Sequence, residues 1–498
     1  MAGRLEDIVA ALATADPERE SLWWKGSWIR RREFMAIAEK AAGSLAKAGF
    51  REGDRLITLL PNSPAVIALS WACWKLRGAI VPLNLQAGAP AVIRSISRVD
   101  PFAVAVPDMP GVPVSQFDAL PVPVVRVSPE GDVPSFTGKR PETPDDPADP
   151  DIAVIFATSG TTGLPKAVPL SHENLLSNVR AAEKHYLPFD RTTEVVLNVL
   201  PNFHALGYST SGLLALLTGS KQALAPNFMP AERTLDIMRA TGVTFLVGVP
   251  AMLVLLLSAV DRGAEAPKTL RSVISGGDRF PTNLDERAQR IFGIGVTEGY
   301  GLTECSPVVA VNRSVEVRKL GTVGTPLPGF ECRICDASGT NLPAGSEGVL
   351  WLRGPSVTKG YFRDPELTAK RFVDGWFETG DVARLDREGY VSIIDRATDV
   401  IIVGGFNVYP QEVEDVLCSC PGVKEAAVVG EPHSVSGQIV KAFVVPSGPD
   451  VTQKDLHAYC KEQLAHYKVP RSFEFVDRLP RSAMGKVLRR TLRDRQGD

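Results

Sequence analysis

An α/β fold of two domains is predicted by the order of helix and strand patterns along this 498-residue chain. In the N-terminal part, apolar runs typical of buried strands alternate with amphipathic stretches, which indicates parallel sheets covered by helices. Short strands rich in glycine and proline follow from about Gly321, and a compact α+β pattern follows Arg396. We therefore expect a large N-terminal domain, residues 1–395, made of two doubly wound α/β subdomains and a small β unit. Residues 396–498 would form a small α+β C-terminal domain.

The individual elements are predicted from apolar periodicity and from the residues that end helices. In the first α/β region they are a helix at 32–49 that ends at Gly49, a strand at 54–60, a helix at 63–77 and a strand at 78–83. The stretch 141–150, rich in proline and aspartate, is typical of a linker. A second α/β region is expected from about 151 to about 310.

Within that second region, Pro250 divides the apolar run 244–260 into a strand and a helix, and the run is short for a membrane span. The later elements fit a β unit followed by an α+β segment. They are strands at 331–334, 348–353 and 390–394, helices at 410–418 and 454–466, strands at 425–430 and 441–445, and a basic tail at 481–495.

Composition excludes several classes of protein. The chain is 44% hydrophobic and 22% charged with a net charge of −2, which gives no general case for binding nucleic acid or an anionic membrane. Its seven cysteines are an odd number in a long chain, so we expect free thiols in a reducing compartment. Cys332 and Cys335 lack a second pair nearby, which argues against zinc. Without a signal-like N-terminus or a transmembrane segment, a cytoplasmic location is expected.

The most informative motif is TSGTTGLPK, which follows an apolar strand at 152–157. Glycines let backbone N–H groups approach an anion, hydroxyl groups add donors, and a lysine closes the loop, so the motif suits a polyphosphate. It is not a Walker loop, because only two residues separate its glycines and alanine follows its lysine. The motif consists of Thr158, Ser159, Gly160, Thr161, Thr162, Gly163, Leu164, Pro165 and Lys166.

A second motif runs from Gly299 to Glu304. Tyr300 between two glycines offers an aromatic face to a flat group such as a base, although this pattern alone is often a turn. Thr303 can donate to a phosphate oxygen, and Glu304 can bind magnesium, which prefers carboxylate and phosphate oxygens together. Its specificity is therefore moderate.

Three further motifs are weak when each is taken alone. Asp381 in a loop suits ribose hydroxyls but equally suits an Asx turn. The pair Gly404 and Gly405 allows close approach to a thin ligand, or forms a turn before the helix that Pro410 begins. Lys486, on a glycine-preceded loop in a basic tail, can swing into a site or remain solvated.

Together the five motifs resemble those of the adenylate-forming superfamily, which includes acyl-CoA synthetases, peptide-synthetase adenylation domains and firefly-type luciferases. The resemblance extends from Leu60 to the loop of Lys486, and the motifs stand in the family's order. It implies a reaction in which ATP, with magnesium, activates a carboxylic acid and CoA then accepts the acyl group. It also implies that the C-terminal domain is mobile and rotates between the two half-reactions.

The resemblance assigns roles to individual residues. The first motif would hold the β- and γ-phosphates of ATP, Thr303 the α-phosphate, Glu304 the magnesium ion, and Lys486 both the α-phosphate and the carboxylate of the acid. The adenine and ribose would be bound by Gly276, Gly277, Glu298, Gly299, Tyr300, Asp381 and Arg396. Glu298 departs from the family pattern, which often has an amide there.

The resemblance also implies an acid pocket, a CoA tunnel and a hinge. His204 would border the pocket and gate it; without the resemblance, a packed and hydrogen-bonded core histidine would be the preferred interpretation. The pocket residues would be His204, Tyr208, Val249, Gly276, Gly301 and Leu302; the tunnel residues Gly404, Gly405 and Phe406; and the hinge residues Ala397 and Thr398. Thr398 stands where the family commonly has aspartate or lysine.

Four functions remain open from the sequence. The leading one is an AMP-forming acyl-CoA synthetase, an acid–thiol ligase, which acts on a small-molecule carboxylic acid as a monomer or homodimer. An acyl-AMP ligase that loads an acyl carrier protein is close to it, and the lack of a large insertion before the C-terminal domain favours CoA. A luciferase-like oxygenase and a non-catalytic relative are further alternatives. The presence of Lys166, Glu304, Asp381, Arg396 and Lys486 together argues against the last.

Overall fold

Two compact units make up the computed structural model. It describes residues 3–110, 114–131, 149–158, 166–186, 189–433, 436–448, 451–481 and 487–494. Unit 1 contains Met1–Cys332 and Leu352–Phe377, and unit 2 contains Arg333–Trp351 and Glu378–Asp498. The domain boundary expected at 395/396 lies within unit 2, and remains a prediction about which part of the chain rotates.

Unit 1 contains a six-stranded sheet in the order β6-β5-β3-β4-β7-β8. All neighbouring strands are parallel except β7 and β8, which form an antiparallel pair. The buried apolar runs of the sequence form its centre, as expected for strands covered on both faces. The strands are β3 (Arg55–Thr58), β4 (Ala79–Pro82), β5 (Ala103–Pro107), β6 (Val124–Val127), β7 (Ile152–Thr158) and β8 (Lys166–Ser171).

The second sheet of unit 1 has nine strands in the order β15-β14-β13-β12-β11-β9-β10-β1-β2. From β13 to β1 its neighbours are parallel, and both edges carry antiparallel strands. The strands are β1 (Glu20–Trp24), β2 (Ser27–Arg30), β9 (Val195–Asn198), β10 (Lys221–Leu224), β11 (Phe245–Gly248), β12 (Ser272–Ser275), β13 (Thr297–Gly301), β14 (Val308–Val311) and β15 (Thr325–Pro326).

The doubly wound α/β prediction is confirmed, but the chain divides between the two sheets differently from the expectation. The second region was expected to begin at about 151, yet β7 pairs with β4 of the first sheet. Conversely, the N-terminal β1 pairs with β10 of the second sheet. Apolar patterning defines a strand but not its partner, because pairing depends on contacts distant in sequence.

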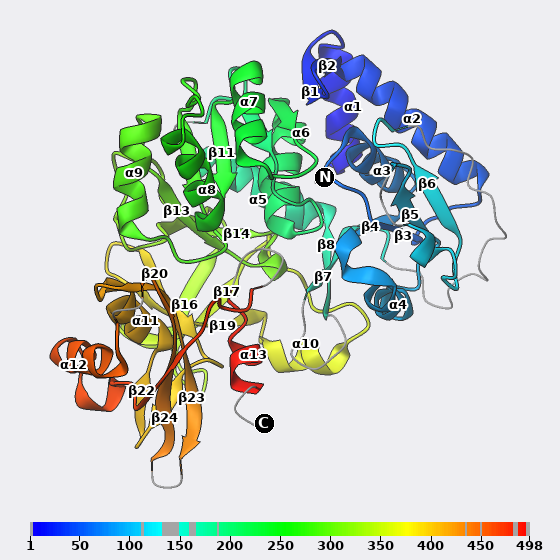
Figure 1. The fold of residues 1–498 in the computed structure, drawn as a ribbon. Coiled ribbons are helices and arrows are strands. Elements are labelled where there is room, and N and C mark those ends of the chain that lie inside the picture. The colour runs from blue at the N-terminus through cyan, green and yellow to red at the C-terminus, as the bar shows by residue number, and fades with distance from the viewer. Residues whose placement is uncertain are drawn as a thin grey trace. The chain divides into compact units, whose positions relative to one another are not determined.

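Helices accompany both sheets, and α7, α8 and α9 run alongside the strands of the nine-stranded sheet (Figure 1). The helix predicted at 32–49 is α2, and Gly49 follows it at φ 94°, a backbone conformation that glycine adopts freely. The helical segments of unit 1 are α1 (Leu5–Ala15), α2 (Arg31–Lys47), α3 (Pro64–Lys75), η1 (Leu85–Ala87), α4 (Gly88–Val99), η2 (Ser115–Phe117), α5 (His172–His185), η3 (Gly207–Leu213), α6 (Leu214–Thr218), α7 (Ala231–Thr241), α8 (Pro250–Asp261), α9 (Thr282–Phe292), η4 (Thr303–Cys305) and α10 (Pro365–Arg371).

A five-stranded sheet in the order β16-β17-β19-β18, with β20 paired to β19, contains the points where the chain passes between the units. Its strands are β16 (Glu331–Cys335), β17 (Glu347–Arg353), β18 (Phe372–Val373), β19 (Trp376–Leu385) and β20 (Val391–Arg396). This sheet is the β unit that short glycine- and proline-bounded strands predict.

The rest of unit 2 is the predicted α+β segment, built on a sheet in the order β22-β21-β24-β23 with β25 paired to β24. The long antiparallel pair of β23 and β24 is prominent in Figure 1. Its elements are β21 (Ile401–Val403), β22 (Phe406–Val408), α11 (Pro410–Ser419), β23 (Val423–His433), β24 (Gly437–Pro446), α12 (Gln453–Gln463), η5 (His466–Lys468), β25 (Ser472–Phe475) and α13 (Arg489–Asp494).

All seven cysteines are free thiols, and burial raises the pKa of Cys332 to about 12, so this thiol stays protonated at neutral pH. Among the helices that the structure describes, none combines the length and apolar character that crossing a bilayer requires.

Candidate active site

The candidate residues of the second sheet lie where its parallel strands end. His204 follows β9, Val249 follows β11, Gly277 follows β12, and Tyr300 lies near the end of β13. Strands β9, β11, β12 and β13 are consecutive and parallel, so their carboxyl ends share one edge of the sheet. Ligands of open α/β sheets bind at that edge.

Two glycines bring these loops close together. Gly277 has φ 82°, and a Cβ placed there would lie 3.4 Å from Cγ1 of Val249 and 3.6 Å from Cδ2 of Leu206. A Cβ on Gly276 would lie 3.3 Å from the carbonyl oxygen of Gly299. The segments after β9, β11 and β12 therefore lie close together and close to β13.

The small size of two other residues near this edge, Gly301 and Gly207, is explained by the backbone that packs against them. A Cβ on Gly301 would lie 2.1 Å from the carbonyl oxygen of Pro307, and one on Gly207 would lie 2.5 Å from that of Pro201. Close backbone packing thus requires glycine at both positions, so their small size does not report the size of the acid. The ring of Tyr208 packs edge-on against Phe156 of the first sheet, with centroids 5.4 Å apart.

His204 is half-buried, and its ring lies 4.8 Å from that of Phe203. Burial lowers the pKa of His204 to about 4, so the imidazole is neutral at physiological pH. Among the described residues its ring nitrogens have no hydrogen-bond partner, unlike those of a typical packed core histidine. Leu302, the remaining pocket candidate, is half-buried and donates its N–H to the carbonyl of Pro307.

Glu298 is a half-buried carboxyl group in β13. Burial raises its pKa to about 7, while the N–H of Gly321 at 3.3 Å and the charges of Arg279 and Arg318 act in the opposite direction. Near neutral pH the side chain is therefore a mixture of a neutral acid, which can donate a hydrogen bond, and a carboxylate. This partial protonation reduces the negative charge that the side chain carries near neutral pH.

Glu304 lies in η4 and is half-buried. The hydroxyl of Tyr361 donates to its Oε1 at 2.9 Å, and no residue that the structure describes donates to Oε2. Burial, reinforced by the charge of Glu304, raises the pKa of Tyr361 far above its ordinary value, so its hydroxyl stays protonated and acts as a donor. One oxygen of Glu304 thus has a fixed partner within the protein.

The first motif joins two antiparallel strands. Thr158 ends β7 and Lys166 begins β8, and these two residues are paired in the register of the strands. Nζ of Lys166 lies 5.6 Å from the ring centroid of Tyr361, the residue that also contacts Glu304. The phosphate-loop candidates Ser159, Gly160, Thr161, Thr162 and Gly163, together with Lys486, lie outside the described residues.

The two ribose candidates come together in unit 2. Asp381 and Arg396 are opposite each other in the pairing of β19 with β20, and Nε of Arg396 lies 2.7 Å from Oδ1 of Asp381. The aspartate side chain is 4% exposed and that of the arginine 45% exposed, so one partner is fixed and the other reaches solvent. Asp381 also donates its N–H to the hydroxyl of Thr379, an ST turn that orients the loop.

The tunnel and hinge candidates lie in turns of unit 2. Gly404 and Gly405 have φ of 58° and 86°, in the turn between β21 and β22. Phe406 is 58% exposed and stacks on Tyr467 with centroids 4.7 Å apart. Ala397 and Thr398 are exposed, in a turn after β20. Backbone N–H groups near an exposed aromatic ring suit a thin ligand with an amide backbone.

The donor set fits a magnesium ion that a nucleotide shares. No group of three or more histidine, cysteine, aspartate or glutamate residues in the described ranges forms a metal cage by itself. Magnesium is commonly bound by one or two carboxylates together with substrate phosphates and waters. Glu304, with an oxygen that no described residue occupies, provides such a carboxylate.

Two residues with a place in the site were missed by the sequence reasoning. Tyr361 is one, because none of the five motifs includes it and its contacts are distant in sequence. Asp399 is the other: it follows the hinge pair and binds Arg493 and Arg489 of α13. The basic character of the tail was the available signal, since clustered arginines often have acidic partners.

Family models match both parts of the chain. The model of the AMP-binding enzyme matches residues 9–362, and that of the AMP-binding enzyme C-terminal domain matches residues 412–486. The chain therefore belongs to the AMP-binding enzymes of the adenylate-forming superfamily, which confirms the family that the five motifs suggest.

Named relatives align over nearly the whole chain. A long-chain-fatty-acid–CoA ligase of Bacillus subtilis is 31% identical, with 98% of this chain and 94% of the relative covered. A feruloyl-CoA synthase of an Amycolatopsis species is 34% identical, with 97% of each covered. A fatty acid–[acyl-carrier-protein] ligase, ScoC of Streptomyces coeruleorubidus, is 33% identical, with 97% of this chain and 94% of the relative covered.

Solved structures agree with the fold. ATP-bound MatB from Rhodopseudomonas palustris superposes with a TM-score of 0.87 at 31% identity, and covers 100% of this chain and 99% of its own. The o-succinylbenzoate CoA synthetase MenE of Bacillus subtilis, in complex with ATP and magnesium, has a TM-score of 0.85 at 29% identity and covers 99% of each chain.

Proposed function

We propose that this chain is an AMP-forming acyl-CoA ligase that converts a carboxylic acid, ATP and CoA into acyl-CoA, AMP and pyrophosphate. The observation that carries the proposal is the convergence of Lys166 and Glu304, from two separate motifs, on one tyrosine. A bound triphosphate requires a cation and an oxygen ligand for its metal ion close to each other. Relatives named as CoA ligases, aligned from end to end, support the same reaction.

In the first half-reaction a carboxylate oxygen of the acid attacks the α-phosphorus, and the bond to the leaving pyrophosphate breaks. Lys166 and the loop before it would hold the pyrophosphate, and Thr303 the α-phosphate. Glu304 would bind Mg²⁺, which neutralises charge on the phosphates when it is bound. Lys486 would bridge the reacting groups, and positioning with charge neutralisation supplies most of the catalysis.

In the second half-reaction the sulfur of CoA attacks the carbonyl carbon of the acyl-adenylate, and AMP leaves. Residues 396–498 would rotate about Ala397 and Thr398, which lie in an exposed turn suited to changes of backbone angle. Lys486 would then leave the site, and Gly404, Gly405 and Phe406 would line the path of the pantetheine arm. Asp381 and Arg396 would hold the ribose throughout.

An assay of pyrophosphate release over aliphatic, aromatic and polycyclic acids tests the proposal. Acid-dependent release of pyrophosphate, with acyl-CoA detected by mass spectrometry, is the expected result. Absence of acid-dependent release across the whole panel would exclude the reaction for these substrate classes. The panel also identifies the acid, which the relatives leave open because their names include both long-chain and aromatic substrates.

A second candidate is a ligase that loads an acyl carrier protein, and the similarity to ScoC supports it. The two candidates share the adenylation step and differ only in the thiol acceptor. Parallel reactions with CoA and with a phosphopantetheinylated carrier protein separate them, because mass spectrometry identifies which thiol carries the acyl group. Faster acylation of the carrier protein would replace the first proposal by the second.

A further inference from the structure

Residues 355–364, here called the strap, are bound along their length to other parts of unit 1. At the start of the strap, Nδ2 of Asn174 donates to the carbonyl oxygen of Pro355 at 2.7 Å. The hydroxyl of Ser306 donates to the carbonyl oxygen of Ser356 at 2.8 Å. The strap is therefore fixed to α5 and to the residue that follows η4.

The middle of the strap connects the two candidate motifs. The N–H of Thr358 donates to the carbonyl oxygen of Glu304 at 2.8 Å, and its hydroxyl donates to that of Pro169 in β8 at 2.5 Å. The N–H of Phe362 donates to the carbonyl oxygen of Ala167, also in β8, at 2.8 Å. Main-chain bonds thus hold the strap to η4 on one side and to β8 on the other.

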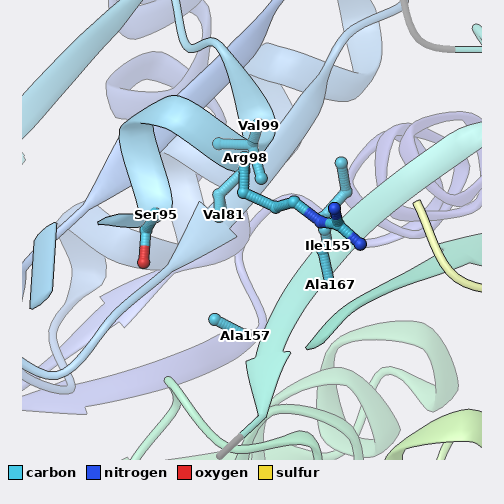
Figure 2. A pocket seen from close by; sticks show the side chains of 7 residues that line it. All are labelled: Val81, Ser95, Arg98, Val99, Ile155, Ala157 and Ala167. Atoms are coloured by element: carbon cyan, nitrogen blue, oxygen red, sulfur yellow. The ribbon is translucent and has the colours of Figure 1, made fainter. Parts of the chain in front are cut away.

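The far end of the strap is held by an ion pair. Nη2 of Arg98 lies 2.5 Å from Oδ2 of Asp364, whose Oδ1 accepts the N–H of Leu367 at the start of α10. Figure 2 shows the Arg98 side chain extending from α4 across a small pocket toward Ile155 and Ala167. The ion pair anchors this end of the strap. The other side chains of the pocket are mostly aliphatic, so the pocket offers few polar groups to a ligand.

Tyr361, within the strap, is 5% exposed and held at three points. Its N–H donates to the hydroxyl of Thr368 at 2.9 Å, and its ring lies edge-on to Phe372 at 5.9 Å. Its hydroxyl donates to Oε1 of Glu304 at 2.9 Å, and Nζ of Lys166 lies 5.6 Å from its ring centroid. A donor fixed in this way allows little freedom to the carboxylate that it binds.

We propose that Tyr361 is a positioning residue for the metal site: its hydroxyl holds Oε1 of Glu304, so that Oε2 is the oxygen presented to Mg²⁺. This inference rests on the proposed function, because it assumes that Glu304 binds the metal of a magnesium–nucleotide complex. Partners of ligating carboxylates set the orientation of the ligand, and their loss weakens metal affinity. The strap provides the rigid support that this orientation requires.

A structural role alone makes a different prediction. A buried tyrosine hydroxyl needs some hydrogen-bond partner, and the bond to Glu304 satisfies that need whether or not a metal binds. In that case Tyr361→Phe would lower thermal stability and leave metal affinity unchanged. The two accounts therefore differ in the metal affinity that they predict for Tyr361→Phe, and this affinity can be measured without turnover.

The measurement is Mn²⁺ binding to the full chain, followed by electron paramagnetic resonance in the presence of α,β-methylene-ATP. Tyr361→Phe keeps the ring that faces Lys166 and Phe372 and removes only the hydroxyl. We expect its Mn²⁺ dissociation constant to be about 10- to 100-fold higher than that of the wild type. Binding within twofold of the wild type would overturn the proposal.

Two further variants make the result specific. Tyr186→Phe is the matched control: Tyr186 is also 5% exposed in unit 1, and its ring packs edge-on against Phe245, so this variant should bind Mn²⁺ as the wild type does. In a Glu304→Gln background, Tyr361→Phe should add no further loss, because both changes act on the same carboxylate. An additive loss would contradict a role that acts through Glu304.

The same titration separates failure of this inference from failure of the proposed function. A wild-type chain that binds no Mn²⁺ in the presence of the nucleotide analogue would contradict both. A wild-type chain that binds Mn²⁺ while Tyr361→Phe binds equally well would contradict only the role of Tyr361. Acid-dependent release of pyrophosphate by the wild type tests the proposed function independently.

Discussion

Two carboxylates, the half-buried Glu304 in unit 1 and the buried Glu414 in unit 2, have contrasting surroundings. Glu414 is 7% exposed; Val428 donates its N–H to Oε1 at 2.7 Å, and Nη2 of Arg489 lies 2.7 Å from Oε2. Glu304 has the neutral hydroxyl of Tyr361 on one oxygen, and no cation among the described residues forms an ion pair with it. One carboxylate has partners on both oxygens, and the other has a partner on one.

This difference fits a structural role for Glu414 and the metal-binding role proposed for Glu304. A buried charge is costly unless it is paired, and Glu414 meets that condition within unit 2 through α13. Burial still raises the pKa of Glu414, although Arg489 acts in the opposite direction. Glu304, by contrast, is half-buried and retains an oxygen for a partner from outside the chain.

The largest expected effect is on stability and concerns Arg489→Met. This change removes the cation from a pair whose side chains are 14% and 8% exposed and leaves Glu414 uncompensated. Loss of one partner of a buried pair costs about 3–5 kcal/mol. Chemical denaturation followed by circular dichroism should show this loss in the free energy of unfolding.

Lys468→Met is the control for that experiment. Lys468 lies 2.6 Å from Glu412 in the same unit, but the glutamate side chain is 43% exposed. An exposed ion pair contributes roughly 0–1 kcal/mol, so this variant should unfold almost as the wild type does. Equal losses in the two variants would mean that burial does not distinguish these ion pairs, and the comparison with Glu304 would lose its basis.

Glu304→Gln should affect activity and spare stability. The amide keeps an oxygen to accept the hydroxyl of Tyr361 and removes the charge that would bind the metal. We expect adenylation to fall about 100- to 1,000-fold, the range for loss of one charge-stabilising group, as measured by pyrophosphate exchange. A melting temperature well below that of the wild type would instead give Glu304 a structural role like that of Glu414.

Glu298→Gln should give the smallest effect, one that depends on pH. Burial raises the folded-state pKa from the ordinary 4.5 to about 7, so the folded protein holds this proton more tightly than the unfolded chain does. The contribution of Glu298 to stability is therefore present at low pH and is lost as the pH rises from about 4.5 to about 7.

The Gln variant avoids this loss, because an amide does not ionise. Its free energy of unfolding, relative to the wild type, should rise between pH 4.5 and pH 7 and then level off. Denaturation at a series of pH values measures the difference. A difference that is constant with pH would show that Glu298 ionises normally, unlike the buried Glu414.

Local patterning predicted most elements because it reports burial directly. The strand expected at 348–353 is β17 (Glu347–Arg353), and the helix expected at 410–418 is α11 (Pro410–Ser419). What patterning missed is pairing between distant segments, such as β1 with β10 and β7 with β4. An apolar strand fits either sheet, so the choice depends on packing that no short window contains.

The candidate site likewise contains some residues that the sequence predicted and others that it did not. Asp381 and Arg396, which the motifs assign together to the ribose, lie next to each other in an ion pair. The contact of Tyr361 with Glu304 was missed, because the strap has the composition of an ordinary loop and acts through main-chain bonds to β8 and η4. Motif spacing readily identifies residues that would contact a ligand. It identifies less readily the residues that orient those ligand-binding side chains.

Leu352–Phe377 belongs to unit 1, although the segments on both sides of it belong to unit 2. The chain therefore passes between the units three times, and no contiguous fragment contains the whole of one unit without part of the other. A protease that cut once between Trp351 and Leu352 would leave both units joined through the other two crossings. Each unit boundary lies inside a strand, β16, β17 or β19, so fragments divided at a unit boundary would break the five-stranded sheet that these strands form.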